Sequence, residues 1–283
     1  MPRCNNMSLR CTKCKVRVAL PRHLRNTDVI ASQACGGPLV SSGKTTTLKL
    51  TLESKGKSRL RDAVPSIPNF AALLATAHAL ADRAGAVILP HFRSGLAIDH
   101  KGGTLFDPVT AADIAAETAI REAIADTHPA HGIVGEELGA SRPEADYCWI
   151  IDPIDGTRAF IVGQPLWGTL IGLLRNGTPL LGLMNQPFTG ERFWSGDTQS
   201  YFRHASGVEQ TIRTRACGSF REALLLSSSP DLFETEEEQA SFARISEAVR
   251  LRRFGGDCYN YCLLALGKID LVEEAGLKDL DIL

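Results

Sequence analysis

The sequence predicts a layered α/β (α+β) fold in which sheets are packed between helices. Helical and strand patterns alternate along residues 67–283 without a regular βαβ repeat. A fully apolar stretch, 147–151, leads directly into an aspartate, as a buried strand that ends at a site would. The 283 residues are 44% hydrophobic, which is enough chain for a sizeable core.

Four helices are expected besides a short one at 158–162. Residues 70–93 repeat apolar side chains at helical spacing, and Thr110–His128 has the same pattern with acids between. A capping residue and acids open the helix at 235–249, and Gly267 ends a short apolar helix at 259–266.

The expected strands are short and apolar. Asn176-Gly177 lies between two of them and predicts a hairpin turn. The strands are 132–135, 147–151, 167–174, 179–184, 191–194, 224–227 and 269–274.

Residues 1–66 have a different composition. They hold 13 Lys and Arg against 3 Asp and Glu, whereas the remainder holds 18 against 29. They show no sustained periodicity, so we expect a basic, disordered extension before a domain at 67–283. The composition is equally compatible with an organelle transit peptide or with a stretch that is not part of the natural protein.

Several classes of function are disfavoured. The net charge of −1 favours neither nucleic acid nor membrane, and no run of about 18 apolar residues predicts a membrane span. The basic extension lacks the interleaved aromatics of a nucleic-acid binder. Cys11 and Cys14 form one tight pair where a structural zinc site needs two. The eight scattered cysteines indicate a reducing compartment, and we expect a cytoplasmic location, with organelle targeting left open.

The densest chemical signal is the segment 152–157, Asp-Pro-Ile-Asp-Gly-Thr. Mg²⁺ prefers about six oxygen ligands, and Asp152, Asp155 and the Ile154 carbonyl could supply part of them. Gly156 permits close backbone approach, and Thr157 opens a short helix whose N–H groups could bind phosphate. An Asp-Pro pair is usually a plain turn, but charged residues rarely end a buried strand without a partner.

Two further acids lie upstream. Glu136 follows the strand at 132–135, and Asp113 lies in the first turn of the helix that starts at Thr110. Each has an ordinary explanation as an acid near a helix N-terminus.

Together these motifs resemble the inositol monophosphatase superfamily of magnesium-dependent phosphatases. The resemblance rests on residues 107–113, 135–137, 149–157 and 256–261, with a looser match at 274–281. It implies an αβαβα sandwich of the inositol monophosphatase and fructose bisphosphatase type. It also implies two or three Mg²⁺ ions and hydrolysis of a small phosphorylated metabolite, and members often form homodimers.

The resemblance also implies residue roles. Asp113 and Thr157 would orient or deprotonate the attacking water, while the Gly156 and Thr157 amides would hold phosphate. The ligands of two metals would be Glu136, Asp152, Ile154 (through its carbonyl), Asp155 and Asp281.

Residues 155–174 are most similar to the histidinol-phosphate phosphatase type within this superfamily. Arg158-Ala159-Phe160 stands where inositol phosphatases usually have Thr-Asn-Phe. We expect Arg158, Asp257 and Glu274 to contact the substrate, since two acids could pair with the amine of histidinol phosphate. Both acids could also be ordinary cap or surface residues. Inositol monophosphatase and nucleotide 3′-phosphatase are the alternatives.

The chain departs from the family near Leu283. Members continue for several tens of residues, so we expect a phosphatase domain that lacks its C-terminal end. Asp281 would then lie on a fraying terminus, after Leu280 instead of the family's tryptophan. A weakened second metal site follows, and an inactive, truncated or frame-shifted paralogue is the non-catalytic alternative.

Overall fold

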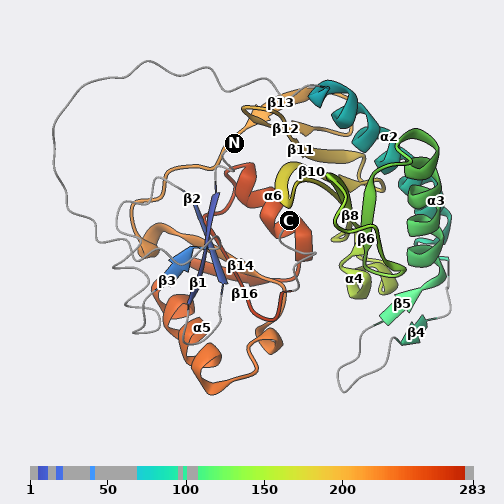
Figure 1. Cartoon of the computed structure of the whole chain (residues 1–283). Helices are drawn as coiled ribbons and strands as arrows, with labels where there is room; N and C mark the ends of the chain where they lie inside the picture. Colours follow the sequence, from blue (N-terminus) through green and yellow to red (C-terminus); the bar gives the residue numbers. More distant parts are fainter. Residues whose placement is uncertain are drawn as a thin grey trace, which may run out of the picture.

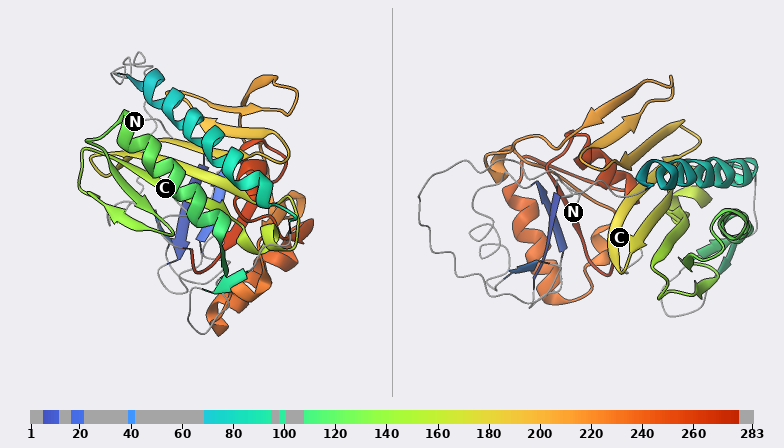
Figure 2. Two further views of the ribbon diagram at one scale, coloured as in Figure 1. Left: turned by 90° about the vertical axis from the view of Figure 1, so that its right-hand side faces the viewer. Right: turned by 45° about the horizontal axis from the view of Figure 1, so that its top comes forward.

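The computed structural model describes residues 6–11, 17–21, 39–41, 69–94, 98–100 and 108–277. They form five layers: helices α2 and α3, an eight-stranded sheet, helix α6, a six-stranded sheet and helix α5 (Figure 1, Figure 2). This arrangement confirms the predicted αβαβα sandwich.

The helices start where capping residues favour it. Thr110 caps α3 in a capping box with Asp113, and Thr235 caps α5 in the same way with Glu238. Helix α2 ends earlier than predicted, at Ile88, and a 3-10 turn containing a proline follows it. The α-helices are α2 (Phe70–Ile88), α3 (Ala111–Thr127), α4 (Thr157–Ile161), α5 (Glu236–Ala248) and α6 (Asp257–Ala265).

The eight-stranded sheet has the order β13-β12-β11-β10-β9-β8-β6-β7. Most neighbours are antiparallel, but β6 and β8 are parallel, so both end at the same edge. Strands β7, β12 and β13 were not expected from the sequence. The strands are β6 (Gly132–Gly135), β7 (Gly139–Ser141), β8 (Tyr147–Asp155), β9 (Gly168–Arg175), β10 (Thr178–Gln186), β11 (Glu191–Ser195), β12 (Ser200–Arg203) and β13 (Glu209–Ile212).

Helices α2 and α3 cover one face of this sheet (Figure 2). The buried guanidinium of Arg192 on β11 links α2 to the sheet. Its Nε donates to Oδ1 of Asn185 on β10 at 2.8 Å, and its Nη2 donates to Oδ1 of Asp82 on α2 at 2.5 Å. By length and composition alone, Phe70–His91 could cross a membrane. This is weak evidence, because a core helix meets the same criterion and this one buries a face in the largest hydrophobic cluster.

Helix α6 lies between the two sheets. Cys258 and Cys262 pack against Met184 and Phe193 of the eight-stranded sheet. On its other side Leu264 packs against the six-stranded sheet. The outer face of that second sheet is covered by α5.

The six-stranded sheet has the order β15-β14-β16-β2-β1-β3. Its strands β14 and β16 are parallel, and β14 also pairs in parallel with β15. These strands are β14 (Leu224–Ser227), β15 (Leu251–Phe254), β16 (Leu271–Glu274), β1 (Asn6–Cys11), β2 (Arg17–Pro21) and β3 (Leu39–Ser41). A separate two-stranded sheet joins β4 (Ile98–His100) to β5 (Pro108–Thr110).

Strands β1, β2 and β3 are a correction, because we expected no regular structure in residues 1–66. Strand β2 pairs antiparallel with β16, where Glu274 lies opposite Arg17, and β1 joins β2 to β3. Backbone pairing at an open sheet edge needs little sequence signal, which explains why short strands without long periodicity escaped notice. The rest of 1–66 lies outside the described residues, and the domain boundary at 67 stays a prediction.

Candidate active site

The end of β8 carries the first two predicted acids. The strand runs to Asp155, beyond the predicted end, and its register against β9 shifts between Asp152 and Asp155. The Thr169 hydroxyl donates to the Pro153 carbonyl at 2.9 Å and fixes this irregular stretch. The Ile154 N–H donates to Asp152 Oδ1 at 3.1 Å, so the buried Asp152 carboxylate is oriented by its own turn.

Gly156 links β8 to α4 in a left-handed conformation, with φ of 85°. A Cβ at this position would lie 2.9 Å from the Leu166 carbonyl oxygen and 3.1 Å from Asp257 Oδ2. The Thr157 hydroxyl donates back to the Ile154 carbonyl at 3.0 Å. Glycine is therefore needed both for the turn and for the close approach of its neighbours.

Glu136 follows β6, the parallel neighbour of β8. Its N–H donates to the Ile151 carbonyl at 3.1 Å, which places Glu136 beside the end of β8. The separate acidic motifs at 136 and 152 therefore meet at one sheet edge, as ligand sites at the carboxyl ends of parallel strands do.

Asp113 has a local role. Its Oδ2 accepts the Thr110 N–H at 2.9 Å and the Thr110 hydroxyl at 2.6 Å, which is the capping box of α3. The side chain is buried, and it does not line the cavity described below. Its predicted part in handling water stays a prediction.

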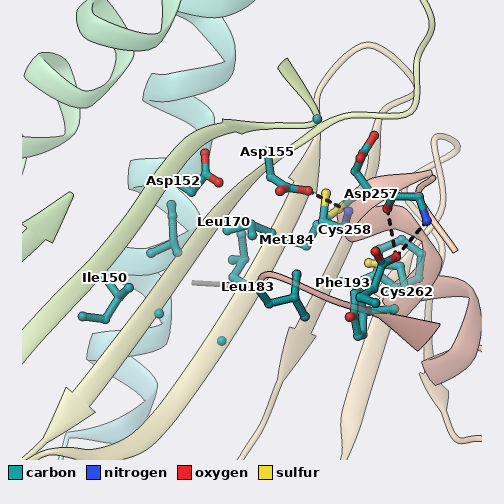
Figure 3. A pocket seen from close by; sticks show the side chains of 18 of the residues that line it. Ile150, Asp152, Asp155, Leu170, Leu183, Met184, Phe193, Asp257, Cys258 and Cys262 are labelled. Atoms are coloured by element: carbon teal, nitrogen blue, oxygen red, sulfur yellow. Dashed lines mark hydrogen bonds between the residues drawn. The ribbon is translucent and has the colours of Figure 1, made fainter. Parts of the chain in front are cut away.

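The turn before α6 connects the second half of the chain to Asp155. Gly255, Gly256 and Asp257 all have positive φ, of 86°, 126° and 43°. For Asp257, which is not glycine, this conformation is strained. The turn directs the Cys258 N–H to Asp155 Oδ2 at 2.6 Å (Figure 3).

Asp257 and Glu274 approach the same place from different elements. The N–H and the hydroxyl of Ser228, just after β14, each donate to Glu274 Oε1 at 2.9 Å. Burial raises the pKa of Glu274 to about 7, and the Asp257 and Asp155 carboxylates add to the shift. Burial also raises the pKa of Asp257, while Ser228 and Arg158 oppose that shift. The raised pKa values show that burial disfavours the charged forms of both acids.

These residues surround a cavity of about 540 Å³, within the range of small-molecule sites. Its acidic end continues into an apolar part formed by residues such as Leu170 and Leu183 (Figure 3). Arg158 is exposed and does not line it. Asp281 and Asp107 lie outside the described residues. The predicted residues that line the cavity are Glu136, Asp152, Ile154, Asp155, Gly156, Thr157, Asp257 and Glu274.

The fit of this site to Mg²⁺ rests on donor chemistry. Glu136, Asp152 and Asp155 line one cavity together with Ile154, and carboxylate and carbonyl oxygens are the hard donors that Mg²⁺ prefers. Within the described part of the chain, however, no three His, Cys, Asp or Glu side chains are grouped closely enough to hold an ion. The donor atoms are of the type that Mg²⁺ prefers, but the described side chains are not arranged around one ion position.

Two residues of this region were not expected from the sequence. Ser228 lies in a run of serines after an apolar strand, and the pairing of β14 with β16, which brings it to the site, leaves no signal in the sequence. Glu117 lies one turn after Asp113 on α3 and is fully buried, and it accepts the N–H groups of Glu137 and Leu138.

The five layers and the acidic cavity at the strand ends define the class of protein, an αβαβα sandwich with an acidic site. Comparison with known proteins identifies the family. The model of the inositol monophosphatase family matches residues 70–283. The chain therefore belongs to the inositol monophosphatase family.

Three similar proteins show how much of this chain is shared with individual relatives. The bifunctional phosphatase IMPL2, chloroplastic, of Arabidopsis thaliana is 42% identical over 82% of this chain, which spans only 64% of that relative's length. The histidinol-phosphatase of Mycobacterium tuberculosis is 33% identical over 74% of this chain and 80% of its own length. A solved inositol monophosphatase from Zymomonas mobilis superposes with a TM-score of 0.66 at 45% identity, covering 75% of this chain and 80% of that one.

Proposed function

We propose that this chain hydrolyses a small phosphate monoester with Mg²⁺ and water, and that its substrate is L-histidinol phosphate. The observation that carries the substrate assignment is the pair of Asp257 and Glu274 beside the acidic cavity end. A phosphate bound near Gly156 and Thr157 would leave the cationic amine within reach of this pair. The names of the histidinol-phosphatase relatives support the same substrate.

The proposed metal ligands are those inferred from the family motifs. Glu136, Asp152 and the Ile154 carbonyl would hold one ion, and Asp152, Asp155 and Asp281 a second. Bound Mg²⁺ would polarise the phosphoryl oxygens and make a water more acidic.

The protein's own groups have separate tasks in this proposal. The N–H groups of Gly156 and Thr157 bind phosphate oxygens. The Thr157 hydroxyl, which donates to the Ile154 carbonyl, would orient a water together with Asp113, as the family motifs imply. The Cys258 N–H holds Asp155 in a fixed orientation.

Phosphate release by the purified full chain tests the function. Histidinol phosphate should be hydrolysed faster than inositol 1-phosphate or adenosine 3′,5′-bisphosphate, and EDTA should abolish the activity. Asp152→Asn should be inactive, whereas Asp197→Asn, at an exposed loop position, should match the wild type. A preference for inositol phosphate would overturn the substrate assignment. Activity that survives EDTA would overturn the proposed dependence on Mg²⁺.

Inositol monophosphatase activity is the second candidate, because a solved relative with that name is 45% identical. Inositol is neutral and has no charge for Asp257 to pair with. Asp257→Asn should therefore lower kcat/KM for histidinol phosphate and leave hydrolysis of inositol phosphate nearly unchanged. An inactive paralogue is distinguished by thermal melting, since an intact site should be stabilised by millimolar Mg²⁺.

The location is a separate question. The chloroplastic relative and the basic, acid-poor residues 1–66 support organelle import, in competition with the predicted cytoplasmic location. A fluorescent protein fused after residue 66 should enter the organelle if this segment is a targeting peptide. Diffuse cytoplasmic signal would support the predicted cytoplasmic location.

Self-association into a homodimer also stays a prediction, which sedimentation of the purified chain would check.

A further inference from the structure

Glu117 is a buried carboxylate that accepts hydrogen bonds from two backbone N–H groups of one turn and from an arginine on its own helix. It lies on α3 and is 0% exposed. Its Oε2 accepts the Glu137 N–H at 2.8 Å, and its Oε1 accepts the Leu138 N–H at 3.1 Å. Arg121 Nε donates to the same Oε1 at 2.7 Å.

That turn carries Glu136, which lines the cavity. The backbone here is held from two sides, since the Glu136 N–H bonds to the Ile151 carbonyl of β8 and the next two N–H groups bond to Glu117. Arg121 also donates to the Gly139 carbonyl, so it connects Glu117 to the far end of the turn.

Gly135 shows how closely Glu117 approaches this backbone. A Cβ at position 135 would lie 1.9 Å from Glu117 Oε1, so any residue other than glycine would force the Glu117 carboxylate to move. The glycine before the acidic pair is thus explained by the carboxylate that packs on it.

Only a carboxylate satisfies this arrangement. Two backbone N–H groups and one guanidinium N–H converge on the Glu117 oxygens, and an ionised acid accepts all of them. Glutamine has nearly the same shape, but its NH₂ group would face one of these donors and leave that N–H without its acceptor.

We propose that Glu117 is a positioning residue that fixes the orientation of Glu136 toward a bound divalent cation. The inference rests on the proposed metal-dependent function. Residues that orient a metal ligand typically change metal affinity by about tenfold to 100-fold when they are replaced. Glu117→Gln should therefore weaken cation binding by about tenfold or more, and kcat at saturating Mg²⁺ should fall much less.

Mn²⁺ titrated into the full chain and followed by electron paramagnetic resonance gives the affinity without any turnover. The matched control is Glu122→Gln on the same helix, because the Glu122 side chain is 62% exposed and pairs with Arg83 at the surface. The control should bind Mn²⁺ like the wild type. Equal affinity of folded Glu117→Gln and wild type would overturn the proposal.

Two further measurements cover the remaining outcomes. If Glu117→Gln does not fold, Arg121→Gln is measured instead, and unchanged Mn²⁺ affinity in that variant overturns the proposal. Amide hydrogen exchange of Glu137 and Leu138 should be faster in Glu117→Gln, and unchanged protection also overturns it. If the wild type itself binds no Mn²⁺, the proposed function fails, and the exchange result still decides whether Glu117 holds the turn.

Discussion

Glu273 on β16 gives a quantitative prediction about stability and pH. Its side chain is 0% exposed, and neither carboxylate oxygen has a hydrogen-bond partner among the described residues. Because strand residues alternate, it faces the same side as Leu271 and Ala275, which pack in the apolar cluster under α5. Burial raises the pKa of Glu273 to about 8, the Glu274 carboxylate adds to this, and Arg244 opposes it.

The raised pKa means that the folded protein holds this proton more tightly than the unfolded chain. The stabilisation from protonated Glu273 is therefore complete below pH 4.5, the ordinary value, and is lost as the pH rises to about 8. At pH 7, which is about 2.5 units above the ordinary pKa, the carboxyl of the folded protein is still mostly protonated. At about 1.4 kcal/mol per unit, the cost to folding at pH 7 is about 3 kcal/mol.

Glu273→Gln removes the titration but keeps the shape and the burial. Urea unfolding of both proteins at pH 5, 6, 7 and 8 should show the variant gaining about 1 kcal/mol on the wild type for each pH unit. The control Glu247→Gln, an exposed acid on α5, should give a difference that does not depend on pH. A constant difference between Glu273→Gln and wild type would refute the assignment of a buried, neutral carboxyl.

Three other outcomes are expected. Burial, and secondarily His128, lower the pKa of His131, whose Nδ1 accepts the Trp149 N–H at 3.1 Å. The wild type should therefore lose stability as the pH falls below about 6.5, and His131→Gln should flatten that slope in thermal melts. Gly135→Ala, which forces a Cβ onto Glu117, should lower the urea midpoint and Mn²⁺ affinity together; an unchanged midpoint would contradict the contact. Arg192→Met should cost about 1–3 kcal/mol, since it leaves the buried Asn185 Oδ1 without its donor; a double-mutant cycle with Asp82→Ala should give only a small coupling, because the Asp82 side chain is 69% exposed.

Local chemistry made part of this protein predictable. Thr110 and Thr235 each precede an acid by three residues, and both helix starts follow that capping pattern. The apolar run that leads into Asp152 predicted a buried strand. The family resemblance assigned Glu136 and Asp155 to one site, and the parallel pairing of β6 with β8 brings both to the same sheet edge.

The missed parts depend on contacts between distant segments. Ser228 became part of the site only because β14 and β16 pair in parallel, which no local pattern reveals. Glu117 has the same sequence signature as any acid on an exposed helix face, and its burial follows from the approach of Gly135. Strands β1 and β2 depend on an available edge of β16, not on their own periodicity.

Helix α6 contacts both the eight-stranded and the six-stranded sheet, so the distance between these two sheets affects the hydrogen bonds of the site. Its first turn bonds to Asp155 on one side, while Leu264 is anchored in the opposite half. Cys258, whose N–H bonds to Asp155, also packs against the eight-stranded sheet. A sliding or opening movement between the sheets would therefore change the packing of α6 and the orientation of the Asp155 carboxylate together.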